Sequence, residues 1–213
     1  MKIPDNFLFY LSMHRECSER LLVRAKEISA NDLEVSLDRD DIRIKKMVRD
    51  VLGEVHRMKA FVRLSTHGAL VLFGYLKPRH RIAEHICDHL ARRNAGIIVV
   101  LGNGSESWAC LCRGSRVWRD HGSGLTQTLE RLKAALPDDA VACKPGPDPE
   151  TLWQAYYDSQ YCPERKNLLA YHKNMPRRDQ EAAGLRLVQN KKNVTLDDFF
   201  VSSLSSAGEH NES

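Results

Sequence analysis

The chain has 213 residues, of which 42% are hydrophobic, and its 32 basic residues exceed its 28 acidic residues by four. This composition is sufficient for one domain with a hydrophobic core and excludes disorder over the whole length. The longest apolar run, "AGIIVVLG" (95–102), is far shorter than the roughly 20 residues that span a bilayer. The first 19 residues also lack the uninterrupted apolar region of a secretory signal. We therefore expect a cytoplasmic protein that does not contact a membrane.

Six cysteines are scattered along the chain without metal-site or redox-motif spacing. No C-x-x-C occurs, and neither does the C-x-x-x-C-x-x-C typical of a radical-SAM enzyme. Cys110 and Cys112 alternate on a predicted strand, a position more typical of a core face than of a metal site. The pattern predicts reduced thiols and no bound cofactor.

The first third of the chain favours helices. Apolar residues recur at helical spacing over 18–28, and the acidic "DRDD" (38–41) is typical of helix caps. From Ile42 to Val55 apolar residues repeat every three or four positions, which predicts an amphipathic helix.

Alternating patterns then predict a sheet. We expect strands over 60–65 and 69–76, joined by a hairpin, and further strands over 96–101, 108–113 and 116–120. Helices are predicted over 82–93 and 125–136. The order indicates an α+β fold, in which an antiparallel sheet (hairpin plus three-strand meander) is covered on one face by helices. There is no glycine-rich βαβ fingerprint, which disfavours a Rossmann or P-loop fold.

The last third is predicted to be helical before it becomes polar. A proline-rich stretch (137–150) precedes helices over 150–161 and 163–174, and after about residue 192 the chain has the composition of a flexible tail. We therefore divide the chain into a short acidic helical segment (1–41), an α+β core domain (42–178) and a C-terminal extension (179–213).

Charge is distributed unevenly along the chain. Residues 1–41 have a net charge of −3, residues 42–93 of +8 and residues 163–178 of +4. Basic groups concentrated in two segments favour a polyanionic partner. Alternatively, folding spreads these groups around the surface and no patch forms. If they converge, the predicted nucleic-acid-binding residues are Arg57, Lys59, Arg63, Arg92, Arg93, Arg165, Lys166, Asn167, Lys173 and Arg177.

Histidines supply the candidate metal and acid/base groups. His85 and His89 are four positions apart and share a helix face, as zinc ligands do, but no third ligand is evident. An exposed or interfacial pair is the alternative. His56 and His89 are candidate acid/base residues, since histidine titrates near neutral pH. No nucleophile elbow and no phosphate-cradling glycine loop occurs.

Aromatic and basic residues alternate between Leu152 and Arg178. Rings that stack on bases beside cations that contact phosphates are what single-strand or flipped-base binding requires. The alternative is that the rings, Trp153 and Tyr157 above all, pack this segment on the sheet.

Four blocks in this sequence carry a family resemblance: "EVHRMKAFVRL", "LKPRHRIAEHICDHLARR", "LWQAYYDSQYCPERKN" and "YHKNMPRR". The chain resembles a family of uncharacterised DNA metabolism proteins over about Lys45–Arg178. Members are related to the N-terminal region of uracil-DNA-glycosylase-like fusion proteins. They are encoded beside a radical-SAM protein of DNA modification or repair. This chain departs from the family in two places. Its N-terminal segment is short and acidic where members have a longer helical region, and Arg178-Asp179 stands after Met175-Pro176 where members have further aromatic residues.

The resemblance implies a DNA-linked role by association, carried by His56, Arg57, Lys59, Arg92, Arg93, Arg165, Lys166 and Asn167. We therefore expect an accessory protein that binds DNA or another nucleic acid and acts with a radical-SAM or glycosylase-type partner. Two alternatives stay open: an enzyme that acts on DNA through a histidine, and a docking module for an acidic protein.

Overall fold

The computed structural model describes residues 2–67, 70–137 and 168–184. Its helices are α1 (Phe7–Met13), α2 (Glu19–Lys26), α3 (Ala30–Val35), α4 (Arg39–Phe61), α5 (Ala83–Arg93), α6 (Leu125–Ala135), α8 (Leu168–Asn174) and α9 (Arg177–Ala182). Its strands are β1 (Ser65–His67), β2 (Val71–Tyr75), β3 (Ile98–Gly102), β4 (Ser107–Arg113) and β5 (Arg116–Gly122). The α+β class predicted from the sequence is confirmed.

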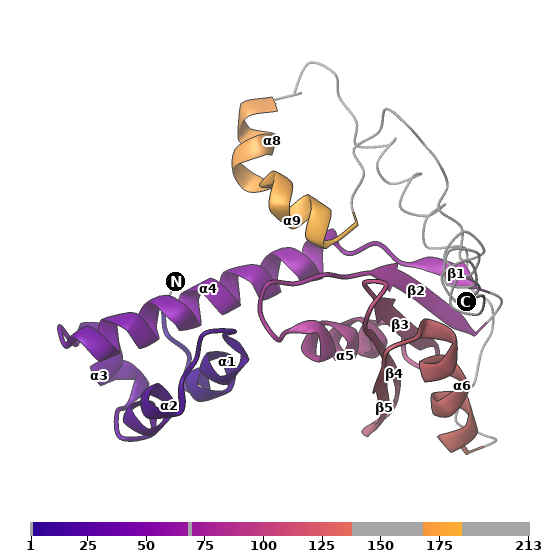
Figure 1. Cartoon of the computed structure of the whole chain (residues 1–213), viewed down its shortest axis with the longest axis horizontal. Coiled ribbons are helices and arrows are strands. Elements are labelled where there is room, and N and C mark those ends of the chain that lie inside the picture. Colours follow the sequence, from indigo (N-terminus) through magenta and orange to yellow (C-terminus); the bar gives the residue numbers. More distant parts are fainter. Residues whose placement is uncertain (1, 68–69, 138–167, 185–213) are drawn as a thin grey trace, which may run out of the picture.

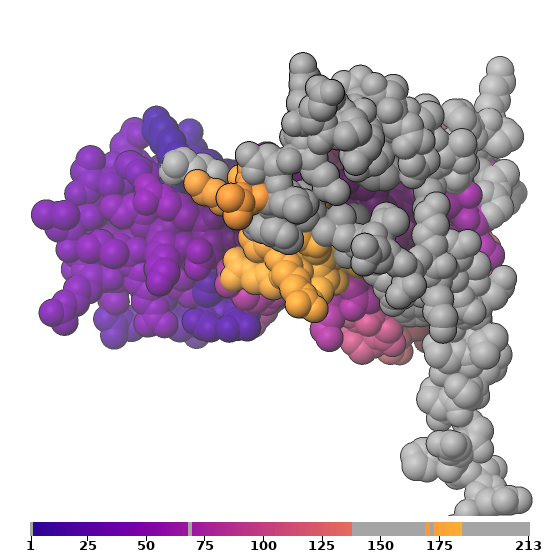
Figure 2. Space-filling model, turned by 90° about the horizontal axis from the view of Figure 1, so that it is seen from above, coloured from indigo at the N-terminus to yellow at the C-terminus, as the bar shows by residue number. Residues whose placement is uncertain are grey.

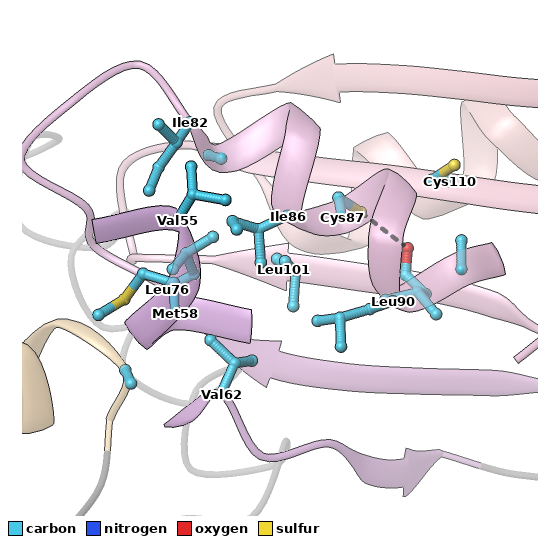
Figure 3. Packing of buried hydrophobic residues seen from close by; sticks show 14 of the residues in the cluster. Val55, Met58, Val62, Leu76, Ile82, Ile86, Cys87, Leu90, Leu101 and Cys110 are labelled. Atoms are coloured by element: carbon cyan, nitrogen blue, oxygen red, sulfur yellow. Dashed lines mark hydrogen bonds between the residues drawn. The ribbon is translucent and has the colours of Figure 1, made fainter. Parts of the chain in front are cut away.

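The long helix α4 links the N-terminal helices to the sheet (Figure 1). Its first half packs with α1, α2 and α3 around a core that contains Leu11, Leu33 and Ile44. Its second half turns Val55 and Met58 towards the sheet and α5, into a second core (Figure 3). The predicted boundary at 41/42 falls within the first turn of this helix, and the domain division as such remains a prediction.

The five strands form one sheet in the order β1-β2-β3-β4-β5. Three of the four pairings are antiparallel, as expected, but β2 and β3 are parallel. The expectation of a purely antiparallel sheet was wrong here because α5 connects these two neighbours and returns the chain in the original direction.

Helices cover both faces of the sheet rather than the one face expected. On one side α5 and the end of α4 cover Leu72, Val99 and Leu101. On the other side α6 packs Leu132 against residues that include Ile98 and Val100. All five residues of β3 are buried, as a central strand covered on both faces requires.

One predicted strand begins later than expected. The segment "AFVRLS" was expected to be extended, whereas α4 continues to Phe61 and the strand begins at Ser65. Met58 extends the helical apolar spacing of Val51 and Val55, and burial of all three in one core favours the helix up to this point. The predicted helix over 150–161 and the residues 163–167 of the next one lie outside the described residues.

No described helix combines the length and the apolar character needed to cross a bilayer. The longest one, α4, exposes Arg43, Lys46 and Arg49 along one side.

Candidate anion-binding pocket

A buried acid on α4 holds the segment that follows β2. Glu54 lies on the apolar side of the helix, 3% exposed. Its Oε1 accepts the backbone N–H of Arg79 at 2.8 Å, and its Oε2 accepts that of His80 at 3.0 Å. Satisfying two backbone donors offsets the cost of burying this carboxylate. Glu54 thereby fixes the loop that presents Lys77 and Arg79.

One turn further along α4, Arg57 attaches the C-terminal helices. Its Nε lies 2.7 Å from Oδ2 of Asp179 in the first turn of α9, and the Asp179 side chain is 4% exposed. The backbone N–H of Lys77 donates to the carbonyl of Ala182 at 2.7 Å. In Figures 1 and 2, α8 and α9 accordingly lie over the second half of α4.

A glycine allows the end of α9 to approach the sheet edge. Gly184 has φ +65°, and a Cβ there would lie 2.8 Å from Cβ of Tyr75. Both the backbone conformation and the close approach favour glycine at this position. Tyr75, at the end of β2, is therefore brought beside the C-terminal helix.

These contacts enclose a pocket of about 530 Å³ between α4, the loop after β2 and α9. We call it the α4–α9 pocket. Its wall consists of Glu54, Arg57, Tyr75, Lys77, Pro78, Arg79, Arg178, Asp179, Glu181 and Ala182. Three segments that are far apart in the sequence thus contribute basic residues to one cavity, whose volume suits a small ligand or a single phosphate-bearing group.

The carboxylates of the pocket wall are already engaged. Glu54 binds backbone N–H groups, Asp179 pairs with Arg57, and Glu181 accepts from Arg177 at 3.1 Å. By contrast, the side chains of Lys77 and Arg79 are exposed and form no ion pair with a carboxylate of the described residues. The charge that the pocket offers to a ligand is therefore positive.

Two neighbouring histidine rings, tilted by 36° to each other, lie beside Arg79. The rings of His14 and His80 are 4.3 Å apart, and both residues are buried. Nη2 and Nε of Arg79 lie 2.9 and 3.2 Å from Nε2 of His80. Burial, with the charges of His14 and Arg79, lowers the pKa of His80 to about 4, and burial also lowers the pKa of His14. A neutral His80 can accept from Arg79, which orients the guanidinium at the pocket wall.

The predicted nucleic-acid-binding residues separate into different environments. Arg57 lines the pocket, whereas Lys59 is half-buried and its charge lowers the pKa of His85 and His89 on α5. Arg63 is half-buried, and its Nη1 donates to the carbonyls of Ala60 at 2.7 Å and Phe61 at 3.3 Å. The structure therefore does not gather these three cations at one site.

The remaining predicted cations lie farther along the chain. Arg92 and Arg93 are exposed in the last turn of α5, and Lys173 is exposed on α8. Arg177 is also exposed and pairs with Glu181. The predicted contacts of Arg165, Lys166 and Asn167 lie outside the described residues.

The histidine candidates do not assemble into a metal centre within the described ranges. His85 and His89 lie on α5 as predicted, but no group of three His, Cys, Asp or Glu that could hold a metal occurs there. His56 is exposed on α4. Its catalytic role, like that of His89, stays a prediction.

Sequence reasoning did not single out several residues of the pocket, namely Glu54, Lys77, Arg79, Arg178 and Asp179. One signal was present. Glu54 interrupts the apolar side of an amphipathic helix, between Val51 and Val55, where an acid must find buried partners. The other four lie in loops or a short helix, where no periodicity indicates which residues meet.

Comparison with protein families gives one result. A family described as a domain of unknown function, DUF4130, matches residues 16–181. Comparison with curated proteins and comparison with solved structures return no match. The matched range contains most of the chain, including α2 to α6, α8 and nearly all of the pocket wall. The protein therefore belongs to the DUF4130 family.

Proposed function

We propose that this protein binds nucleic acid, and DNA in particular, by accepting a backbone phosphate in the α4–α9 pocket. The observation that carries the proposal is the charge balance of the wall: each carboxylate is engaged by the protein, whereas Lys77 and Arg79 are exposed without an acidic partner among the described residues. Phosphate recognition by Arg and Lys supplies most of the affinity of non-specific nucleic-acid binding.

The pocket favours an anion over a neutral ligand for a second reason. One of its cations is held by a contact that leaves its charge available: Arg79 is oriented by a neutral histidine, whereas Arg57 is paired with the buried Asp179. Side chains that are fixed before binding lose less conformational entropy when a ligand arrives. The net charge of +8 over residues 42–93 would also attract a polyanion from solution.

The partner enzyme is a finer proposal that rests on the sequence resemblance alone. We propose that the protein passes nucleic acid to a radical-SAM or glycosylase-type enzyme of DNA repair. Co-purification of the two proteins, with a weaker yield after nuclease treatment, is the expected result. A nuclease-resistant complex without nucleic-acid affinity would instead favour the docking-module alternative.

Fluorescence anisotropy with labelled single-stranded DNA, duplex DNA and RNA tests the binding function. We expect affinity to fall by orders of magnitude between about 50 and 200 mM salt if six or more phosphates are contacted. The double variant Lys77→Ala/Arg79→Ala should weaken binding roughly tenfold or more at the lower salt concentration and reduce the salt slope by about two.

A matched control removes the same charge elsewhere. Arg43→Ala/Lys46→Ala also deletes two exposed cations from this chain, on the first half of α4. It should change the affinity much less than the pocket variant. Equal effects of the two variants would refute the pocket, and the lack of any salt-sensitive affinity below about 10 µM would refute the function.

A further inference from the structure

A second group of bases lies on the side of α4 opposite the α4–α9 pocket. Arg57 and Lys59 are two positions apart on a helix, so their side chains leave the axis about 200° apart. While Arg57 pairs with Asp179 of α9, the half-buried Lys59 leaves α4 on the other side, and α5 packs against α4. The charge of Lys59 acts on both His85 and His89, which lie on successive turns of α5. We call these three residues the Lys59 cluster.

The Lys59 cluster has little negative charge of its own. Asp88 acts on His85, but its carboxylate is held in two hydrogen bonds by Arg119, at 2.7 and 2.6 Å, and also accepts from the thiol of Cys110 at 3.3 Å. On the other side, the charge of Arg93 acts on His89. Within the described part of the chain, the cluster is thus a group of bases without a free counter-ion.

Partial burial makes this arrangement costly for the protein. Burial lowers the pKa of His85, His89 and Lys59, and the charge of Lys59 lowers the two histidine values further. Nε2 of His85 is buried and has no hydrogen-bond partner among the described residues. Neighbouring bases without a free counter-ion are what a bound anion would stabilise.

Aromatic side chains of α1 lie against the same histidine. The ring of His85 meets that of Phe9 edge-on at 5.6 Å and that of Tyr10 at 6.2 Å. Phe9 is 47% exposed, which is unusual for a residue of its size. An exposed ring beside basic side chains provides a stacking surface for a base next to a site for a phosphate.

We propose that the Lys59 cluster and Phe9 form a second binding site, which takes one nucleotide of a single-stranded nucleic acid: the phosphate contacts Lys59, His85 and His89, and the base stacks on Phe9. The site rests on the proposed nucleic-acid-binding function but is separate from the α4–α9 pocket. A duplex does not fit it, because its bases are paired and stacked and cannot lie on Phe9.

The site couples binding to proton uptake. Both histidines have a pKa below the ordinary value of 6.5 and are neutral at pH 7 in the free protein. A bound phosphate favours their charged forms and raises both pKa values. Between the free and the bound pKa, binding takes up protons, so affinity should fall by up to about tenfold per pH unit for each proton as pH rises.

Histidine-ring NMR of the full chain, titrated with pH, tests this site. His85→Gln and His89→Gln assign the two resonances. Saturating oligo(dT) should raise the pKa of His85 and His89 by roughly one to two, while the resonance of His121, which stacks on Trp108 at 5.5 Å, should not respond. Inorganic phosphate at the same phosphate concentration should have a much smaller effect. An equal effect of phosphate would overturn the nucleotide assignment, and no effect of either ligand would overturn the site.

Side-chain variants separate stacking from charge. Phe9→Ala should weaken oligo(dT) binding several-fold without changing the response to inorganic phosphate, whereas Val23→Ala, which truncates another exposed apolar residue, should do neither. Lys59→Met should weaken both ligands and raise the pKa of the two histidines in the free protein. Unchanged oligo(dT) affinity in both Phe9→Ala and Lys59→Met would contradict the proposal.

The pocket variant distinguishes the two sites. Lys77→Ala/Arg79→Ala lowers the overall affinity if the proposed function holds, but at saturating oligo(dT) it should leave the response of His85 and His89 intact. Normal affinity of that variant together with a histidine response would refute the pocket and keep the second site. If the pocket variant lowers the affinity but oligo(dT) does not change the pKa of His85 and His89, the second site is refuted and the pocket is kept.

Discussion

At the residue scale, a few buried polar groups determine how the pocket is built. Both carboxylate oxygens of Glu54 accept hydrogen bonds from the backbone N–H groups of Arg79 and His80. The His80 ring in turn accepts from the Arg79 side chain. The buried Glu54 therefore positions the backbone of Arg79 and His80, and the buried His80 positions the Arg79 side chain. That side chain is exposed to solvent at the pocket wall. Such linked hydrogen bonds are worth more together than singly, because a broken link leaves a buried group unsatisfied.

The depressed pKa of His80 predicts a stability that depends on pH. The unfolded chain binds a proton near pH 6.5, whereas folded His80 does so only at about pH 4. Stability is therefore lost as pH falls through this window, by about 2 kcal/mol between pH 7 and pH 5. Urea denaturation across that range measures it, and His80→Gln should flatten the profile. The exposed His121→Gln serves as a control and should leave it unchanged; parallel profiles for all three proteins would contradict the assignment.

At the element scale, α4 connects the two cores and carries residues of both proposed sites. Its start is fixed by Asp38, whose Oδ1 accepts the N–H of Asp40 at 2.9 Å and that of Asp41 at 3.2 Å. At its other end Arg63 donates back to the carbonyls of Ala60 and Phe61. Both ends thus have partners for backbone groups that an isolated helix leaves unsatisfied.

Loss of the cap should destabilise the whole fold rather than one end of it. Because α4 contributes to both cores, Asp38→Ala should lower the free energy of unfolding by about 1 kcal/mol. Asp38→Asn retains a side-chain acceptor and should cost only a fraction of this amount. Chemical denaturation followed by circular dichroism checks both variants. Equal losses would show that the charge of Asp38, and not its capping geometry, matters.

At the scale of the whole molecule, one ion pair joins the C-terminal helices to the rest. Arg57 of α4 and Asp179 of α9 are more than a hundred residues apart, and Asp179 is buried. Because removal of one partner leaves the other without its counter-charge, a single substitution should cost more than replacement of both. This ion pair, together with the hydrogen bond from Lys77 to Ala182, holds α9 at the α4–α9 pocket.

A double-mutant cycle measures that attachment. We expect Arg57→Met and Asp179→Leu each to destabilise the protein and the double variant to recover part of the loss, with a coupling of roughly 1–3 kcal/mol. The surface pair Arg20–Asp40, in which the Arg20 side chain is 80% exposed, is the control and should show a coupling below about 1 kcal/mol. Faster amide exchange over 177–184 in Arg57→Met should accompany the effect. Coupling as small as that of the control would show that α9 is held by other contacts.

Local patterns in the sequence determined the elements that depend on local physics. The helical spacing of apolar residues predicted α2, most of α4, α5 and α6, and the acidic run at 38–41 predicted the start of α4. Both signals depend only on residues that are close together in the chain. The same reasoning failed at 60–65, where α4 continues to Phe61 and the strand begins only at Ser65. The parallel pairing of β2 and β3 depended on where α5 returns the chain.

The candidate site was decided by tertiary structure. The sequence showed that cations are concentrated in 42–93, and this concentration does contribute Arg57, Lys77 and Arg79 to one pocket. It could not show that Asp179 pairs with Arg57, because that outcome depends on which distant segments pack against each face of the helix. Composition fixes how much charge a chain carries, whereas the packing of remote elements fixes which charges meet and which remain available to a ligand.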